Sequence, residues 1–530
     1  MTKSIFFARQ NYLNLLQKRV SGLKDNYRQN IAIIGDELVG KTSLIFKFLD
    51  TFSDNRILTL YFEARSESIN SFARRFIGVL LYNFLINSAL PLKEDIDFLI
   101  AKSQRYIPKT CEMIKLILDG LSKRKKNNIF SDLMSLCEIL YKETGKSTVV
   151  ILDEFQNLED IGFKNLYRDW SKLLITNKNT MFIIISSLKF KTKAILSKNL
   201  SLLFGNFEVI TVEPFDIRTS EEYLKCKFQN VNLNPALRDF VVHFTGGYPM
   251  YLEIISSAFT EQSGKNLADL LEGLLFDPAG ILNQRFSNYI KRFLDRTNTN
   301  DYISILYLIS SGRNKIKDIG HILHKQKKEL DYRLNYLLEL DTITRNGDFL
   351  KINDRIFSFW MKFVYQEKLQ AFTFNAKNQK EKFRDKIEGM IQEFTLAAGK
   401  PLMERMSDLL RLFENELIQV ERKKIRLNHF REIKPLEFRS QILKNGIIGR
   451  CNESLWIIAV KNEHLNEEDI VEFSKECRKY RHKLQRKIII TLKDIDMNTR
   501  LRALEEKIWA WDINNLNQIL DLYSRPRVIA

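Results

Sequence analysis

The feature that most constrains the fold is a glycine-rich segment that follows a short apolar stretch near the start of the chain. Residues 31–34 read Ile-Ala-Ile-Ile, residues 35–43 read Gly-Asp-Glu-Leu-Val-Gly-Lys-Thr-Ser, and an apolar-periodic segment then runs to Leu49. Glycines at this spacing let backbone N–H groups turn inward around an anion, and a following helix points its positive N-terminal end at the same anion. The motif therefore predicts a phosphate-binding loop between a β-strand and an α-helix.

Each residue of this loop has an expected role. Gly35 and Gly40 permit the turn, and Lys41 would reach the β- and γ-phosphates of a bound nucleotide. The hydroxyl of Thr42 would be a ligand of Mg²⁺, and Ser43 is the next candidate for contact with the nucleotide. The expected cofactors are therefore ATP and Mg²⁺.

A second strand, ending in carboxylates, is needed to hold the magnesium ion and to prepare water for attack. Residues 147–152 form a continuous apolar run that is typical of a central strand of a parallel sheet, and the run ends in Asp153 and Glu154. Asp153 is placed to hold Mg²⁺ through water, and Glu154 to polarise the attacking water. Such an ending is common in ordinary strands, so the upstream phosphate loop is what makes the prediction specific.

Two further apolar segments, 57–62 and 180–187, fit the same parallel sheet. The later segment ends in Ser186 and Ser187. In P-loop ATPases with an additional strand, a polar residue at this position senses the γ-phosphate, so Ser187 or Ser186 is a candidate sensor. The alternative is a pair of serines that satisfy backbone groups at the end of a strand.

Length and charge bound the rest of the protein. A chain of 530 residues is too long for one hydrophobic core and predicts three or four domains. The formal net charge of +18 favours a polyanionic partner, because lysines and arginines that neutralise phosphates release counterions. Basic residues gather at 123–126, 189–198 and 478–487, although charged runs are usually solvated surfaces.

The cysteines and the apolar runs indicate in which cellular compartment the protein is expected. The five cysteines are scattered and contain no Cys-x-x-Cys pair, which favours reduced thiols in a cytoplasmic protein without a structural zinc ion. The longest apolar run, near residues 76–90, is interrupted by Tyr82, Asn83, Asn87 and Ser88. We therefore expect neither a signal peptide nor a membrane span.

The motifs of the first 360 residues occur in an order that resembles a known family. Phe7-Ala-Arg9-Gln10 comes first, the phosphate loop and Leu152-Asp-Glu-Phe-Gln156 follow, and Gly246-Gly-Tyr-Pro249 comes after the two serines. This order is similar to that of the archaeal-type ATPases of the STAND group, which are relatives of the AAA+ proteins. The resemblance implies that Arg9 lies by the nucleotide base. It also implies that Pro249, in a Gly-x-Pro turn, opens a lid helix that helps to sense the nucleotide.

The chain departs from the family at one position. The family often has Gly-Arg where this chain has Gly205-Asn206, so no charge-neutralising arginine carries over to that position. A missing arginine removes a large share of the charge stabilisation of the transition state. We therefore expect hydrolysis to be slow or switch-like.

Residues 296–365 carry the pattern of a winged helix. A hairpin with Asn346-Gly347 at its turn is predicted over 342–350. Three short helical patterns precede it, at 302–309, 316–323 and 327–340.

The third of these helical patterns, together with the turn before it, is rich in basic residues. They are Lys325, Lys327, Lys328 and Arg333. It could enter a major groove of double-stranded DNA, with Arg345 on the wing near the DNA backbone. Winged helices in this ATPase group also serve as plain packing modules. The sequence pattern does not separate the two roles, because base readout is not visible in sequence.

The last segment resembles a restriction-endonuclease-like domain. Residues 455–463 predict a buried strand that contains Lys461, with a helix and a further strand after it. In such nucleases the strand ends in acid-x-Lys and an acidic residue precedes it in a hairpin. The corresponding positions here are Ala459 and Asn445-Gly446, so phosphodiester hydrolysis would lack its metal ligands. We expect a degenerate domain that is retained for binding or assembly.

Two acids close to this strand, Glu453 and Glu463, could replace the missing carboxylates only if the hairpin had a different register. Lys461 alone cannot sustain hydrolysis.

Together these features predict an α/β protein of four parts. They are a P-loop ATPase domain with a parallel sheet (1–215), a helical lid (216–295), a winged helix (296–365), and a helical linker with a nuclease-like α/β domain (366–530). ATP binding and hydrolysis would then form a molecular switch of the STAND type that controls the binding of a partner or of DNA. One alternative is a DNA-binding ATPase similar to archaeal replication initiators. Others are a nucleotide-gated scaffold, which self-associates or binds a protein, and a defence-type nuclease.

Overall fold

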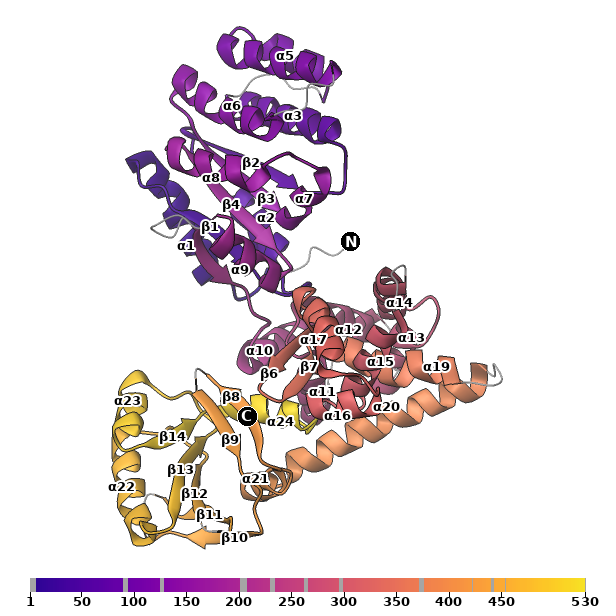
Figure 1. Ribbon diagram of the computed structural model, residues 1–530, viewed down its shortest axis with the longest axis vertical. Helices are drawn as coiled ribbons and strands as arrows, with labels where there is room; N and C mark the ends of the chain where they lie inside the picture. Colours follow the sequence, from indigo (N-terminus) through magenta and orange to yellow (C-terminus); the bar gives the residue numbers. More distant parts are fainter. Residues whose placement is uncertain are drawn as a thin grey trace. The chain divides into compact units, whose positions relative to one another are not determined.

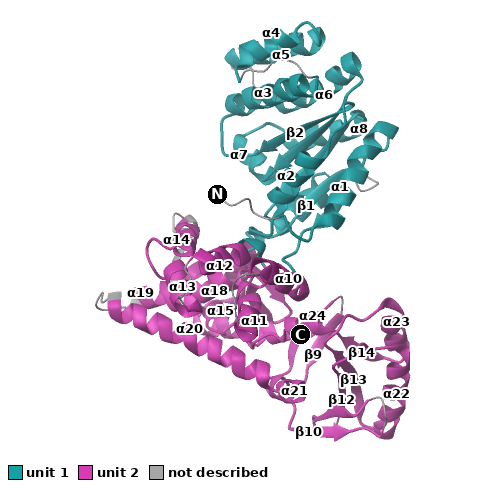
Figure 2. Ribbon diagram, turned by 180° about the vertical axis from the view of Figure 1, so that it is seen from behind, with its two compact units in different colours: residues 1–215, 248–250, 339–341 teal, residues 216–247, 251–338, 342–530 magenta. Residues whose placement is uncertain are grey.

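The computed structural model describes most of the chain in two compact units, coloured separately in Figure 2. Unit 1 contains residues 1–215 with the short segments 248–250 and 339–341, and unit 2 contains residues 216–247, 251–338 and 342–530. The described residues are 6–88, 94–123, 128–200, 207–228, 234–261, 266–294, 299–370, 376–421, 423–439, 443–452 and 454–529.

Unit 1 is built around a parallel sheet with the strand order β2-β3-β4-β1-β5. The strands are β1 (Asn30–Ile34), β2 (Ile57–Glu63), β3 (Ser147–Asp153), β4 (Thr180–Ser186) and β5 (Phe207–Thr211). The first four confirm the predicted apolar segments. Because β4 lies between β1 and β3, the carboxyl ends of these three strands are neighbours on one edge of the sheet.

Helices cover the sheet of unit 1 (Figure 1). One face of the sheet, with Leu60, Val150 and Phe182, shares a continuous core with α3, α6 and α8. The helices are α1 (Gln10–Gly22), α2 (Lys41–Thr51), α3 (Ile69–Asn87), α4 (Ile96–Ser103), α5 (Pro108–Ser122), α6 (Ile129–Thr144), α7 (Leu158–Ile161), α8 (Leu166–Thr176) and α9 (Lys189–Lys198), with short 3₁₀ turns η1 (Leu23–Asp25) and η2 (Phe155–Asn157).

An aromatic cluster lies in this core, beneath the end of β3. Trp170 of α8 is fully buried. Its ring centroid lies 5.5 Å from that of Phe182 in β4 and 6.3 Å from that of Phe155. Phe155 directly follows Glu154, so the acidic turn is anchored in the core through the next residue along the chain.

Within the described residues, every helix of the chain falls short of the length and apolarity that a bilayer span requires.

Unit 2 begins with a helical region. The elements of this region are α10 (Ile217–Lys227), α11 (Pro235–Thr245), α12 (Pro249–Glu261, whose first two residues belong to unit 1), α13 (Leu267–Leu275), α14 (Ile281–Leu294), α15 (Thr299–Ser310), α16 (Ile316–Ile322), α17 (Lys327–Glu339), the strands β6 (Ile343–Asn346) and β7 (Phe349–Ile352), then α18 (Arg355–Trp360), the π-helical turn η3 (Met361–Tyr365), α19 (Gln366–Gln370) and α20 (Ala376–Gly399).

The hairpin β6–β7 follows α15, α16 and α17 as the sequence predicts, but its turn lies one residue later. Asn346 pairs with Phe349, so Gly347 and Asp348 form the turn, and Gly347 has a φ of +59°. Asn346 stays in the ladder because its side chain is used elsewhere. It donates to the Gln419 carbonyl at 2.9 Å and accepts from the Gln419 N–H at 2.6 Å.

This hairpin packs closely against β8 (Glu416–Val420). The Asp348 N–H donates to the Leu417 carbonyl at 2.9 Å, and the Leu417 N–H donates to Asp348 Oδ2 at 2.7 Å. A Cβ atom at Gly347 would lie 1.9 Å from the Leu417 carbonyl oxygen. Only glycine fits this approach, and the hairpin therefore serves as a packing surface within unit 2.

One of the four basic residues of the helix that could enter a DNA groove, Arg333, is not available to DNA. Arg333 is buried and pairs with Asp301 and Glu329, at 2.6 and 2.9 Å. It lies between Leu330 and Leu334 in the part of α17 that faces inward, so its guanidinium extends to α15 instead of to solvent.

The C-terminal part of unit 2 holds a mixed sheet with the order β10-β11-β12-β13-β14. The β10–β11 and β11–β12 pairs are antiparallel, and the β12–β13 and β13–β14 pairs are parallel. One face packs against α22 and α23, and the other shares a core with α21, α24 and the separate hairpin β8–β9. The remaining elements are α21 (Leu402–Leu410), β9 (Lys423–Leu427), β10 (Glu432–Glu437), β11 (Asn445–Arg450), β12 (Leu455–Lys461), α22 (Glu467–Cys477), η4 (Arg478–Tyr480), β13 (Leu484–Thr491), α23 (Met497–Glu505), β14 (Ile508–Trp511) and α24 (Ile513–Leu522).

A buried carboxylate connects several segments of unit 2. Asp521 of α24 pairs with Lys351 at 2.6 Å, with Arg355 at 2.7 Å and with Arg527 at 2.7 Å. These three cations hold the pKa of Asp521 well below its usual range, against the opposing effect of burial. His243 of α11 accepts from the Arg527 N–H at 3.2 Å. Burial, reinforced by Arg355 and Arg527, lowers the pKa of His243 well below its usual range.

Candidate nucleotide-binding site

The phosphate-binding loop lies between β1 and α2, as predicted. Gly40 has a φ of +89°, in the left-handed region that glycine tolerates. At Gly35 a Cβ atom would lie 2.4 Å from the carbonyl oxygen of Val212, the residue after β5, so only glycine allows the loop to pass this close to the Val212 backbone. The ammonium of Lys41 is folded back onto the loop, where it donates to the carbonyls of Gly35 and Asp36 at 3.0 and 2.8 Å.

The electrostatic surroundings of Lys41 suit an anion-binding cation. Burial lowers the pKa of Lys41, and the charges of Glu154 and Asp153 oppose this effect. Removal from water strengthens the attraction of the ammonium for any phosphate that reaches it. Ser43, the next candidate after Thr42, is exposed in the first turn of α2.

The side chain of Thr42 meets the carboxylate of Asp153. Thr42 Oγ1 donates to Asp153 Oδ2 at 2.8 Å, and the hydroxyl of Tyr61 in β2 donates to the same oxygen at 2.9 Å. Burial and the Asp153 charge raise the pKa of Tyr61, so the phenol stays protonated and remains a donor. The hydroxyl of Thr42 and the carboxylate of Asp153 are the oxygen ligands that Mg²⁺ prefers.

Glu154 occupies a strained turn directly after β3. Its φ is +47°, and its N–H donates to Asp153 Oδ1 at 2.9 Å. Its side chain turns toward the end of β4, where Oε2 accepts from Ser187 Oγ at 2.7 Å and from the Ser187 N–H at 3.3 Å. Strain of this kind in a residue that is neither glycine nor asparagine commonly marks a functional site.

Arg9 contacts the phosphate-binding loop at Val39. Its Nη2 donates to the carbonyls of Val39 and Glu213, at 3.2 and 2.7 Å. The guanidinium also stands 5.0 Å from the ring centroid of Phe215 and 5.5 Å from that of Tyr12. These contacts join the entry segment to the loop, beside a pair of aromatic rings.

The Gly-Gly-Tyr-Pro segment also reaches this site. Tyr248 donates from its hydroxyl to Asp36 Oδ2 at 3.1 Å, and Lys189, the first residue of α9, pairs with Asp36 Oδ1 at 2.7 Å. Pro249 follows as the first residue of α12, the position where proline suits a helix.

The structure thus brings Lys41, Thr42, Asp153, Glu154 and Ser187 to one edge of the sheet. Sequence reasoning missed four participants, which are Asp36, Tyr61, Gln156 and Lys189. Two of them lay within quoted motifs: Asp36 is the second residue of the loop, and Gln156 is two residues after Glu154. Gly205 and Asn206, where the family often has Gly-Arg, lie outside the described residues.

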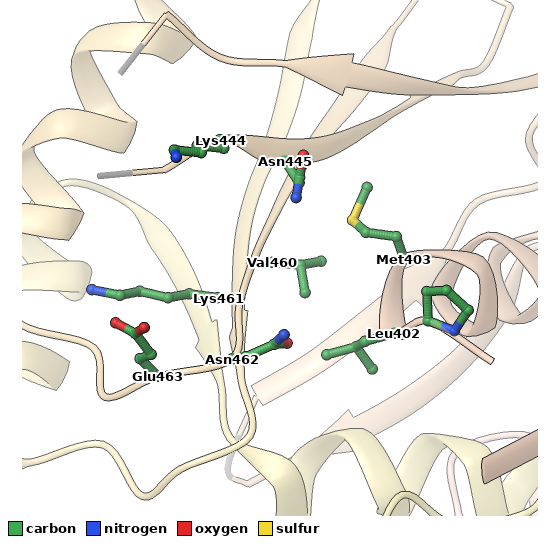
Figure 3. Close-up of a pocket in the computed structure, with 9 residues that line it drawn as sticks. Leu402, Met403, Lys444, Asn445, Val460, Lys461, Asn462 and Glu463 are labelled. Carbon is green, nitrogen blue, oxygen red and sulfur yellow. The ribbon is translucent and has the colours of Figure 1, made fainter. Parts of the chain in front are cut away.

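A pocket of about 620 Å³ lies at the start of β11 and the end of β12, beside the positions where the nuclease-like domain was expected to lack its carboxylates (Figure 3). Gly446 pairs with Ala459 across the two strands, which confirms that these positions are neighbours. Lys461 pairs with the buried Asp469 of α22 at 2.7 Å. The full lining is Pro401, Leu402, Met403, Lys444, Asn445, Val460, Lys461, Asn462 and Glu463.

This pocket offers little to a metal ion. Within the described residues, no group of three or more His, Cys, Asp or Glu side chains could hold one. Glu463 is the single carboxylate in the lining, and Glu453 lies outside the described residues. Lys461, at the position of the lysine in the acid-x-Lys pattern, thus forms an ion pair between β12 and α22.

Among the comparisons with known proteins, one with protein-family models gives a match to the N-terminal part of the chain. Residues 6–255 match the model of a family described as an ATPase domain predominantly from Archaea. No curated protein matched the chain.

Several solved structures are similar to the chain at low identity. A Walker-type ATPase of Pyrococcus abyssi is 18% identical, with 68% of this chain and 97% of that chain covered and a TM-score of 0.48. The ORC2 protein of Aeropyrum pernix is 11% identical, with coverages of 73% and 95% and a TM-score of 0.40. The Aeropyrum pernix ORC1 protein, solved in complex with DNA, is 12% identical, with coverages of 68% and 92% and a TM-score of 0.35. Residues 6–255, with their phosphate-binding loop and parallel sheet, therefore match an ATPase domain of a predominantly archaeal family, and the activity that this match predicts is ATP hydrolysis.

Proposed function

We propose that this protein is an ATPase whose nucleotide state controls its binding to duplex DNA. The observation that carries the nucleotide part is the 2.8 Å hydrogen bond from Thr42 Oγ1 to Asp153 Oδ2, which joins the start of α2 to the end of β3. In phosphoryl-transfer sites Mg²⁺ is held by one or two such oxygen ligands together with the phosphates. When bound, Mg²⁺ would neutralise charge that develops on the β- and γ-phosphate oxygens.

The residues of the site then have distinct tasks. Lys41 binds the β- and γ-phosphates in place of the loop carbonyls, and Ser43 supports the phosphates from the first turn of α2. Glu154 polarises the attacking water, and Ser187 holds Glu154 and senses the γ-phosphate. Arg9 lies by the base, next to Phe215.

The switch would act through the turn before α12. Tyr248 touches Asp36 of the loop, so a phosphate that enters the loop alters the surroundings of the residue that precedes Pro249. This contact supports a nucleotide-sensing role for the Gly-Tyr-Pro turn, as in ATPases of the STAND group.

The DNA-binding part would be the winged helix formed by α15, α16, α17 and β6–β7. On α17, the side chains of Lys327, Lys328, Tyr332 and Asn335 are exposed. Lys317 is exposed in the first turn of α16. A helix that presents lysines, an aromatic side chain and an amide on its outer face suits a major groove, where lysines contact phosphates and amides contact base edges.

The test is ATP turnover and DNA affinity, measured on the same proteins. We expect Glu154→Gln to lower turnover to a small residual rate while ATP binding remains. We expect duplex DNA to stimulate the wild type, and this stimulation to fade as salt is raised, because displaced counterions drive the binding. The double variant Lys327→Ala/Lys328→Ala should lose the stimulation and most of the DNA affinity.

The matched control is Lys423→Ala/Lys424→Ala, which removes two adjacent exposed lysines of β9 and changes the net charge equally. Equal losses in the two double variants would mean that net charge alone, and not α17, attracts the DNA. Turnover indifferent to DNA at both salt concentrations would overturn the coupling and favour a protein-binding switch.

A further inference from the structure

The buried amide of Gln156 connects the end of β4 to the carboxylate of Glu154. Gln156 is 4% exposed. Its Nε2 donates to Glu154 Oε2 at 2.5 Å, and its Oε1 accepts from Ser186 Oγ at 2.7 Å. The amide therefore stands between the strand-ending serine and the residue that is proposed to polarise water.

Ser186 fixes which way this amide points. The Ser186 hydroxyl oxygen accepts from the Leu188 N–H at 3.0 Å. Its own hydrogen then has two acceptors in range, Gln156 Oε1 at 2.7 Å and the Leu188 carbonyl at 3.5 Å, and the shorter contact is the better hydrogen bond. With Oε1 on the hydroxyl, the NH₂ group of Gln156 must face Glu154, and the opposite orientation would set Oε1 against a carboxylate.

The carboxylate of Glu154 is thereby held at one oxygen. Oε2 accepts from the Gln156 amide, from the Ser187 hydroxyl and from the Ser187 N–H, while Oε1 has no partner within the described residues. A carboxylate that is anchored at Oε2 presents Oε1 in one direction. A water activated by Glu154 would thus meet an oxygen whose position is set before the nucleotide arrives.

We propose that Gln156 is a positioning residue for ATP hydrolysis, which acts by holding Glu154 Oε2 so that Oε1 is aimed at the attacking water. The inference rests on the proposed role of Glu154 in the function above. A methionine would fill the same space without the cost of burying an amide, so the retained amide points to its hydrogen bonds as its contribution.

The experiment measures kcat and KM for ATP in the wild type, Gln156→Met, Glu154→Gln and the double variant. We expect Gln156→Met to lower kcat about ten- to a hundredfold with KM unchanged, because a misplaced catalytic group costs rate without costing substrate binding. In the Glu154→Gln background, Gln156→Met should have no further effect. Gln104→Met, in the turn after α4, is the control for the same substitution elsewhere in unit 1.

A second variant separates positioning from packing. Gln156→Glu keeps an acceptor for Ser186 but sets a second carboxylate against Glu154. Its loss of kcat should shrink as the pH is lowered, because the protonated side chain can again donate a hydrogen bond. A packing defect would show no such pH dependence.

The possible failures are distinguishable. If Glu154→Gln leaves kcat unchanged, the proposed role of Glu154 fails and this inference falls with it. If Glu154→Gln lowers kcat to a residual rate and Gln156→Met leaves kcat unchanged, or lowers it equally in both backgrounds, the positioning role alone is overturned.

Discussion

The hydroxyl of Tyr248 donates to Oδ2 of Asp36 over 3.1 Å, so the residue before Pro249 touches the phosphate-binding loop directly. The same carboxylate pairs with Lys189 at the start of α9. One acidic side chain thus joins the loop after β1, the helix after β4 and the Gly-Gly-Tyr-Pro segment. Any change at the phosphates that moves Asp36 reaches all three.

Removing the Tyr248 hydroxyl should weaken ATP binding. Tyr248→Phe deletes one hydrogen bond to a charged group, worth roughly 1.5–3 kcal/mol, so the Kd for ATP should rise by at most about 150-fold, in proportion to the share of that energy that only the nucleotide-bound state gains. Isothermal titration calorimetry measures the change. Tyr27→Phe, at an exposed tyrosine of the same unit, should leave the Kd unchanged. An unaltered Kd in Tyr248→Phe would show that the contact does not affect the bound state.

The Thr42 hydroxyl should matter for magnesium more than for the nucleotide itself. Thr42→Ala removes the donor to Asp153 and one expected metal ligand, so the gain in ATP affinity on adding Mg²⁺ should largely disappear. ATP binding in the presence of EDTA should change little. Thr51→Ala, at the other end of α2, is the control, and its Mg²⁺ dependence should match the wild type. A normal Mg²⁺ response in Thr42→Ala would remove Thr42 from the metal site.

The carboxylate of Asp521 should be important for the stability of unit 2. Asp521→Asn leaves Lys351, Arg355 and Arg527 without their shared anion, and removing one partner of a buried ion pair costs about 3–5 kcal/mol of unfolding free energy. Asp408→Asn breaks exposed pairs with Lys400 and Arg411 and should cost less than about 1 kcal/mol. Urea unfolding followed by tryptophan fluorescence compares the two. Similar costs for both variants would contradict a special role for the buried cluster.

His243 should make unit 2 less stable in mild acid. Its folded-state pKa lies well below the unfolded value near 6.5, so below pH 6.5 the unfolded chain binds a proton that the folded protein excludes. Stability due to this group is therefore full above pH 6.5 and falls by about 1.4 kcal/mol per pH unit below it, down to the folded pKa.

The measurement must isolate His243, because Asp354 works in the opposite direction. Burial raises the pKa of Asp354 to about 6, so protonation of Asp354 favours the folded state below that pH. We compare the wild type with His243→Gln, which keeps an acceptor for Arg527 and does not titrate. The variant should gain stability relative to the wild type as the pH falls from 7 to 5, and His464→Gln, at an exposed histidine, should not. A difference between wild type and His243→Gln that is constant with pH would contradict the prediction.

Local patterns were enough to predict much of unit 1. The apolar run that ends in Asp153 and Glu154 could be recognised as a strand from the sequence. A central parallel strand is buried on both faces, so its polar residues stand at its end. The same logic predicted β1, β2 and β4, and parallel strands then bring their ends together. Thr42 and Asp153 were expected to meet for this reason, although 111 residues separate them.

The contacts that were missed depend on which face a side chain takes. Arg333 was counted among the basic residues of a helix that could enter a DNA groove, but the 3.6-residue repeat of α17 sets it among buried leucines, beside Asp301. Gln156 lay within a quoted motif, yet its proposed role depends on Ser186, which is 30 residues away at the end of β4. Neither outcome follows from composition or spacing, since each requires the register between elements to be known.

The placement of Trp170 gives the acidic turn after β3 an optical reporter. The chain has five tryptophans, and unit 1 contains one of them, Trp170. Its ring packs edge-on against Phe155, the residue that follows Glu154. In a chain whose other four tryptophans are replaced by phenylalanine, the emission of this single indole would report displacement of the acidic turn. Rearrangement during the ATPase cycle could then be followed in real time, without an attached dye.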